Sequence, residues 1–283
     1  MKKIDSECLK DLVLGRKNES HKREYGHALL VCGCSAMPGA AVLATGAALK
    51  SGCGLVTLHS TASAAVAAVS QFPSAMLSLD PADCFSSLPG GLSGYSCIGV
   101  GPGLGKAPMT ALALEALFDN FTAPMVIDAD ALNLIAASPS LLEKIPRGSV
   151  LTPHLGELRR LLPGCPDFAS RESDANAVIS EFCRKIGCVL VKKGYHTQVF
   201  SPDGEMFENT TGNPGMAKGG SGDVLTGLVT GLIARGYDSL SAAMLGVWIH
   251  GYAGDCLTEE FTAEAYNSRD LIDYLYRGFK VLI

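Results

Sequence analysis

The sequence has no apolar run of about 18 residues, the length that a membrane-spanning helix requires. It has no dense cluster of Lys and Arg that would neutralise consecutive phosphates of a nucleic acid, and its formal net charge is only −5. Its first residues carry charges without the apolar core of a signal peptide. These absences predict a cytoplasmic protein that binds small molecules and neither a nucleic acid nor a membrane.

Spacing typical of a zinc site is also missing, although the chain contains 10 cysteines. Cys32 and Cys34 form a C-x-C, and no second pair of Cys or His follows at zinc-ligand spacing. The cysteines are scattered through a large apolar chain. We therefore expect buried, reduced thiols rather than a disulfide scaffold.

The composition that is present describes a compact globular protein. Hydrophobic residues account for 47% of the 283 positions, charged residues for 18%, and 32 residues are Gly. A chain of this length can bury one large core, and no linker or low-complexity tract interrupts it. We therefore expect one domain over residues 1–283.

Short β-rich segments alternate with helical ones along most of the chain, which predicts a largely parallel sheet. A hairpin is expected around Pro202-Asp203-Gly204, and a polar stretch at 258–260 is expected to follow the penultimate helix. Functional groups should lie where the strands end. The expected strands are 28–32, 55–59, 97–100, 125–128, 149–152, 189–192, 197–201 and 205–208, and the expected helices are 39–51, 61–70, 108–120, 221–235, 239–256 and 268–279.

The sharpest local signal is the segment 209–223, which ends in A-K-G-G-S-G-D at 217–223 and runs directly into an apolar helix. Its glycines allow successive backbone amides to point toward an anion, and a helix N-terminus adds about half a positive charge. The segment therefore predicts a phosphate-binding anion hole, formed by Gly219, Gly220, Ser221 and Gly222.

Asp223 follows this anion hole, where a carboxylate beside a phosphate is unfavourable unless it handles a proton. It is therefore a candidate general base that accepts the proton of an attacking hydroxyl, a contribution of about 10²–10⁴ in rate. The alternative is that Asp223 only caps its helix, a position that Asp favours.

Four motifs in one order carry a family resemblance: G-C-S-A-M-P-G-A-A at 33–41, V-L-T-P-H-L-G-E at 150–157, K-G-Y-H-T at 193–197, and G-N at 212–213 with the segment 217–223. The last of them resembles the anion-hole motif of ribokinase-like kinases. The series resembles that of ADP/ATP-dependent NAD(P)H-hydrate dehydratases over nearly the whole chain. The resemblance implies an α/β fold, the ribokinase-like three-layer sandwich, with a mostly parallel central sheet flanked by helices.

The resemblance also implies a reaction. The S-epimer of NADHX or NADPHX would be dehydrated to NADH or NADPH with Mg²⁺ and with ADP, or ATP, as phosphate donor. AMP and phosphate would be released if ADP is the donor. Relatives are often tetramers, so a homo-oligomer is implied, and the epimerase that many bacterial relatives carry as an N-terminal domain is expected to be separate or absent. The implied substrate-binding residues are Ala40, Ala41, Gly103, His154 and Asp223, and the implied nucleotide-binding residues are Lys193, Gly194, Tyr195, His196, Thr197 and Gly222.

Two carboxylates are candidates for the metal. Glu157 matches the Glu of a P-N-x-x-E segment that orders magnesium and phosphate in related kinases, with His154 in place of the Asn. Asp128 ends an apolar strand, and hard cations prefer carboxylate oxygen. The sequence departs from the commoner T-P-H-P-G-E of the family at Leu155.

Several residues keep a structural alternative. Gly39-Ala40-Ala41 suits tight helix packing as well as a ligand, and Gly101–Gly105 suits a plain tight turn. The functional alternatives for the whole chain are a ribokinase-like kinase of a small alcohol or vitamin precursor and a non-catalytic nucleotide-binding protein. The other open assignments are Asp130 as a helix cap, Lys193 and Lys218 as solvated lysines, and Trp248 as a core residue.

Overall fold

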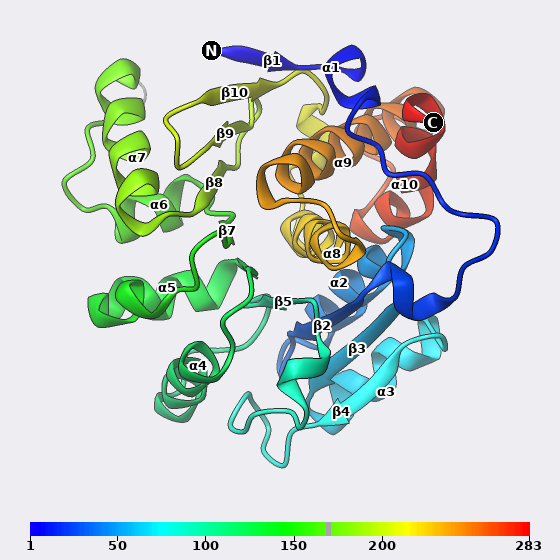
Figure 1. The fold of residues 1–283 in the computed structure, drawn as a ribbon, viewed down its shortest axis with the longest axis vertical. Coiled ribbons are helices and arrows are strands. Elements are labelled where there is room, and N and C mark those ends of the chain that lie inside the picture. Colours follow the sequence, from blue (N-terminus) through cyan, green and yellow to red (C-terminus); the bar gives the residue numbers. More distant parts are fainter. Residues whose placement is uncertain (168–170) are drawn as a thin grey trace.

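A ten-stranded sheet crosses the middle of the computed structural model, which describes residues 1–167 and 171–283 (Figure 1). The strand order is β1-β10-β9-β8-β7-β6-β5-β2-β3-β4. Neighbours from β8 to β4 pair in parallel, β9 is antiparallel to both β8 and β10, and β1 pairs in parallel with β10. The strands are β1 (Lys2–Ile4), β2 (His27–Val31), β3 (Leu55–Ser60), β4 (Met76–Leu79), β5 (Cys97–Val100), β6 (Met125–Ile127), β7 (Val150–Leu151), β8 (Val189–Lys192), β9 (Gln198–Phe200) and β10 (Met206–Asn209).

Helices cover both faces of the sheet (Figure 1). Side chains of a strand alternate between the faces, and along β2 Leu30 joins one buried apolar cluster whereas Leu29 joins the other. The first cluster includes α2, α3, α8, α9 and α10, and the second includes α4, α5, α6 and α7. The expected three-layer α/β sandwich is therefore confirmed.

The helices of the structure include short 3₁₀ segments at several connections. They are α1 (Ser6–Lys10), η1 (Lys22–Tyr25), α2 (Pro38–Lys50), α3 (Ala62–Gln71), η2 (Leu92–Gly94), α4 (Pro108–Asn120), α5 (Ala129–Ala137), η3 (Pro139–Lys144), α6 (Leu155–Leu161), α7 (Glu172–Ile186), η4 (Pro214–Met216), α8 (Ser221–Arg235), α9 (Ser239–Phe261) and α10 (Ser268–Leu282). Within the described residues, none of these helices combines the length and the apolar character that crossing a membrane takes.

The predicted stop of the penultimate helix at 258–260 is wrong. Helix α9 continues through this polar stretch to Phe261 and ends at Thr262, whose φ of +75° leaves the helical region. Leu257, which precedes the stretch, is fully buried and extends the apolar face of the helix. The polar residues therefore mark an exposed turn of the helix rather than its end.

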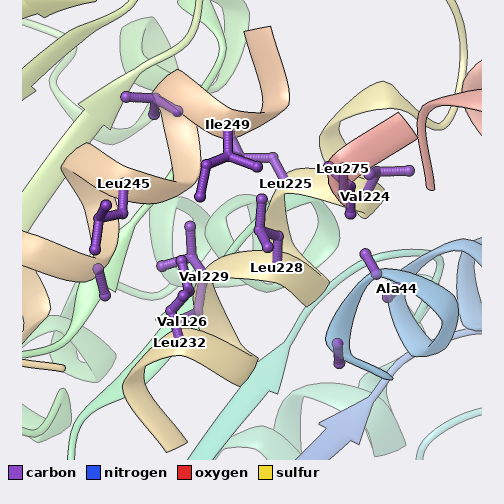
Figure 2. Packing of buried hydrophobic residues seen from close by; sticks show 14 of the residues in the cluster. Ala44, Val126, Val224, Leu225, Leu228, Val229, Leu232, Leu245, Ile249 and Leu275 are labelled. Atoms are coloured by element: carbon purple, nitrogen blue, oxygen red, sulfur yellow. The ribbon is translucent and has the colours of Figure 1, made fainter. Parts of the chain in front are cut away.

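Helix α8 packs very closely against α2 and α9 (Figure 2). A methyl group added at Gly227 would lie 2.0 Å from the backbone oxygen of Ala44, so only Gly permits this approach. Figure 2 shows Leu228 and Val229 of α8 in the apolar cluster that also holds Ala44. This packing orients α8 so that its N-terminus points toward the ends of the central strands.

The contact between α8 and α9 gives a stability prediction. A methyl group added at Gly246 of α9 would lie 2.5 Å from Cγ2 of Val229. Gly246→Ala is therefore expected to lower the free energy of unfolding by about 1–2 kcal/mol, because overpacking outweighs the helix propensity of Ala. Chemical denaturation followed by circular dichroism measures the change. In a Val229→Ala background the cost should be smaller, and an equal cost in both backgrounds would contradict the clash.

Candidate active site

The carboxyl ends of β6, β7 and β8 meet at one edge of the sheet, because these strands pair in parallel. Asp128 follows β6, His154 comes shortly after β7, and Lys193 follows β8. His154 and Lys193 pair directly in a parallel bridge beyond the named strands. The polar residues that lie far apart in the sequence are thereby brought to one place.

A cavity of about 720 Å³ opens at this edge, between the strand ends, the first turn of α8 and the middle of α9. It contains ten of the residues predicted from the sequence: Asp128, His154, Glu157, Lys193, Gly194, Tyr195, Thr197, Ser221, Gly222 and Asp223. The other six predicted residues are not part of its lining, and these are Ala40, Ala41, Gly103, His196, Gly219 and Gly220.

A buried ion pair lies at the floor of the cavity. Lys193 Nζ is 2.6 Å from Asp128 Oδ1 and 4.0 Å from Glu157 Oε2, and Asp128 is only 1% exposed. Thr226 Oγ1 donates a hydrogen bond of 2.8 Å to the other oxygen of Asp128. Lys193 is therefore not a solvated lysine but the positive centre of an acidic cluster.

Asp223 is the third residue of α8, directly above this cluster. The N-cap position belongs to Gly220, at φ +90° and without a side-chain cap, so the interpretation of Asp223 as the cap is wrong. The pKa of Asp223 is raised from 3.8 to about 7, chiefly by burial and then by the charge of Asp128, while Lys193 opposes the rise. A carboxyl group with this pKa can both accept and release a proton near neutral pH.

The raised pKa predicts how stability depends on pH. Between pH 4 and pH 7 the unfolded chain has released the Asp223 proton while the folded protein still holds it, so stability falls as the pH rises. Asp223→Asn removes the ionisable group and therefore this fall in stability with rising pH. The variant is therefore expected to exceed the parent in stability by about 2 kcal/mol above pH 7, and by little at pH 4. Thermal unfolding across this pH range measures the gap, and a gap independent of pH would contradict the prediction.

His154 and Glu157 close the first turn of α6 through a reciprocal cap. His154 Nδ1 accepts hydrogen bonds from the amides of Gly156 and Glu157, at 2.9 and 3.3 Å. Glu157 Oε2 accepts from the His154 amide at 2.9 Å, and Oε1 lies 3.1 Å from His154 Nε2. The ring therefore carries its proton on Nε2 and donates to Glu157. The two side chains act together, as the spacing predicts.

Three of the six predicted residues outside the cavity lining, Ala40, Ala41 and Gly103, form a second group where β2 and β5 end as neighbours. A methyl group added at Gly103 would lie 2.7 Å from Cβ of Ala40, so these two residues face each other. Ala41 is fully buried and packs against Gly33. Asp130 Oδ2 accepts a hydrogen bond of 2.9 Å from the amide of Gly105, and thus ties this loop to α5.

Comparison with known proteins assigns the family. A family profile described as NAD(P)H-hydrate dehydratase matches residues 28–277. The chain belongs to the NAD(P)H-hydrate dehydratase family. The ADP-dependent (S)-NAD(P)H-hydrate dehydratase of Neisseria meningitidis is 36% identical over 247 residues, which cover 86% of this chain and 81% of that protein. The enzyme of the same name from Bacillus subtilis is 34% identical over 271 residues, 94% of this chain and 93% of its own.

Solved structures agree with this family. The crystal structure of the ADP/ATP-dependent NAD(P)H-hydrate dehydratase from Bacillus subtilis, co-crystallised with ATP/Mg²⁺, matches with a TM-score of 0.86 at 30% identity and covers 100% of this chain and 99% of that one. A ribokinase from Thermotoga maritima, with a TM-score of 0.53 at 10% identity, shows the shared fold alone. The chain spans about half the length of several bifunctional NAD(P)H-hydrate repair enzymes; for that of Moorella thermoacetica the identity is 37% over 92% of this chain and 50% of that protein.

The carboxylates of this dehydratase-family site suit a Mg²⁺ ion whose other ligands are water and the phosphates of a nucleotide. Within residues 1–167 and 171–283, no three His, Cys, Asp or Glu side chains come together as metal ligands. Asp128 and Glu157 already share Lys193. Mg²⁺ commonly keeps several waters and takes one or two carboxylates together with the phosphates of a nucleotide. The two residues fit that mode of binding rather than a cage made by the protein.

Another wall of the cavity includes Asn209 and Thr211, which begin the segment 209–223, together with His250. Sequence reasoning missed His250, which lies in an otherwise apolar stretch of α9. The only signal in the sequence was a polar residue interrupting an apolar helix. Trp248 of the same helix is a core residue stacked on Tyr252, which confirms the structural interpretation.

Lys218 is neither solvated nor directed at an anion. Its ammonium group donates to the backbone oxygens of Ala263 and Tyr266, at 2.7 and 2.5 Å, and lies over the Tyr266 ring. Ser268 Oγ donates a hydrogen bond of 2.7 Å to the backbone oxygen of Gly219. The glycine-rich segment of this dehydratase-family protein is therefore fastened to the connection between α9 and α10.

Proposed function

We propose that this protein dehydrates the S-epimer of NADHX or NADPHX at the expense of ADP. The observation that carries the proposal is Asp223, a carboxyl group with a pKa of about 7 in the first turn of α8, near the partly exposed Lys193. Asp223 can accept a proton, and the nearby ammonium group of Lys193 can bind a phosphate. The two relatives described above as ADP-dependent support ADP as the donor.

The first step is phosphoryl transfer. The hydroxyl oxygen on the hydrated nicotinamide ring attacks the terminal phosphorus of ADP, and the bond between this phosphorus and the oxygen of AMP breaks. Asp223 accepts the hydroxyl proton, and the amides of Gly219 to Gly222 hold the transferred group. Asp128 and Glu157 would hold Mg²⁺, which would neutralise phosphate charge during this step.

The second step is elimination. Phosphate is a far better leaving group than hydroxide, so the ring nitrogen's lone pair expels it as the carbon–oxygen bond breaks. The neighbouring ring carbon then loses a proton, which restores the double bond of the dihydronicotinamide. The products are NADH or NADPH, AMP and inorganic phosphate, so water has been removed and one phosphoanhydride bond consumed.

The two groups of residues suggest where each ligand lies. ADP is proposed to occupy the cavity, against Lys193–Thr197 and Gly222. The hydrated ring is proposed to enter from the side of Ala40 and Gly103, at the ends of β2 and β5. Asp223 then lies between the two.

The wider biology follows as part of the proposal. Residues 1–283 would act as one catalytic domain, which is supported by the pairing of β1 with β10 across the length of the chain. We place this domain in the cytoplasm as a homo-oligomer. An epimerase activity would supply the S-epimer.

The test mixes purified protein with NADHX and either ADP or ATP in Mg²⁺ buffer. Only the repaired dihydronicotinamide ring absorbs in the near ultraviolet, so a rise in this absorbance with one nucleotide supports the reaction and identifies the donor. Phosphate release is measured in parallel. A product that keeps its phosphate would instead indicate a kinase, and nucleotide binding without any turnover would indicate a non-catalytic protein.

A further inference from the structure

His250 is a polar residue inside an apolar helix, and its side chain reaches the cavity. It lies on α9, is only 8% exposed, and contributes to the cavity wall. Its Nε2 is 3.3 Å from Oγ of Ser221, the first residue of α8. The contact joins a buried imidazole to the hydroxyl at the mouth of the predicted anion hole.

The imidazole is neutral at physiological pH. Burial lowers the pKa of His250 to about 4, so one ring nitrogen carries a proton and the other does not. A Ser hydroxyl has one proton to donate and two lone pairs to accept with. When Nε2–H donates to a lone pair of Ser221 Oγ, the hydroxyl proton remains available for another acceptor.

A phosphate in the cavity selects this arrangement. Phosphate oxygens accept hydrogen bonds, and a bond to a charged acceptor is about twice as strong as a neutral one. Ser221 then donates to the phosphate while His250 donates to Ser221. In the opposite arrangement, Ser221 Oγ donates its only proton to Nε2 of His250. A lone pair of the hydroxyl oxygen then faces the anion, which is unfavourable.

The turn of α9 that carries His250 is firmly held. Asn209 Nδ2 donates to the backbone oxygen of Val247 at 3.1 Å, and Thr211 Oγ1 donates to that of Trp248 at 2.9 Å. A methyl group added at Gly251 would lie 2.3 Å from Thr211 Oγ1, so loop and helix are in close contact. The backbone that carries the imidazole is therefore held in place, so the imidazole can orient the Ser221 hydroxyl.

We propose that His250 is a positioning residue that orients the Ser221 hydroxyl toward the terminal phosphate of ADP, so that the anion hole gains one side-chain donor besides its amides. This inference rests on the proposed function, since it takes ADP as the occupant of the cavity. His250 itself touches neither the reacting atoms nor the proton that Asp223 accepts.

The test compares the binding of ADP with that of AMP by titration calorimetry, with Mg²⁺ present. Ser221→Ala and His250→Phe are each expected to weaken ADP about tenfold, the size of one charge-assisted hydrogen bond, and to leave AMP within about twofold. His250→Gln, which places an N–H near the position of Nε2, is expected to recover most of the ADP affinity.

A double variant separates positioning from packing. In the Ser221→Ala background, His250→Phe is expected to cause no further loss of ADP affinity. Trp248→Phe, in the buried core of the same helix, is the control that lowers stability without changing the ADP-to-AMP ratio. Independent losses in the double variant, or equal losses for ADP and AMP, would overturn the proposal. Binding is measured without turnover, so a parent protein that binds ADP yet forms no NADH refutes the dehydratase reaction and not this role of His250.

Discussion

Asp223→Asn is expected to lower kcat by about 10²–10⁴, whereas the dissociation constant of ADP changes less than about threefold. The amide keeps the size of the carboxylate and its place in the first turn of α8, but it cannot accept the proton of the attacking hydroxyl. The loss therefore falls on the chemical step. Steady-state turnover of NADHX and calorimetry with ADP measure the two quantities separately.

The pH profile gives this prediction a second readout. In the parent protein, activity should rise as the pH passes about 7, because only the ionised form of Asp223 can accept a proton. The rise should be absent from the residual activity of Asp223→Asn. Asp203→Asn, at an exposed Asp in the hairpin turn, is the control and should behave as the parent. Near-normal turnover of Asp223→Asn would remove the base from the mechanism.

Lys193→Met is expected to lower the free energy of unfolding by about 3 kcal/mol at pH 8. The substitution keeps an apolar stem of similar length and removes the only Lys or Arg within 4.0 Å of the Asp128 and Glu157 carboxylates among the described residues. A buried charge that loses its partner is strongly destabilising, because neither water nor protein then compensates it. Denaturant titration in the absence of nucleotide measures the change.

A compensating substitution tests the cause of this loss. Asp128→Asn removes the stranded charge, so the double variant Lys193→Met/Asp128→Asn should be more stable than Lys193→Met alone by about 1–2 kcal/mol. It should nevertheless remain inactive, because the phosphate site has lost its positive centre. If the second substitution only adds to the first loss, the ion pair does not dominate the stability of this region.

The bounds of helix α8 could be predicted from the sequence because their signals are local. The segment 217–223 contains the start of α8. The helix spans the predicted residues 221–235 because Gly220 and Gly236 flank it at its two ends. The ends of β6, β7 and β8 meet wherever strands pair in parallel, so Asp128, His154 and Lys193 could be brought together without coordinates.

The features that could not be predicted from the sequence depend on contacts between distant segments. Whether Ala40 or Ala41 faces a ligand is decided by the rotation of α2, and Ala41 turned out to pack inward. His250 carries no motif of its own, and only the packing of α9 against α8 places it beside Ser221. Similarly, β1 is too short to be recognised as a strand until it pairs with β10.

The fastening of the glycine-rich segment to the last two helices has a consequence for how the protein is made. Lys218 is anchored to the backbone of Ala263, 45 positions later in the chain, and Gly219 to Ser268, 49 positions later. Residues 263–268 leave the ribosome after the segment 217–223, so this segment cannot adopt its observed geometry until α10 has been synthesised and has docked.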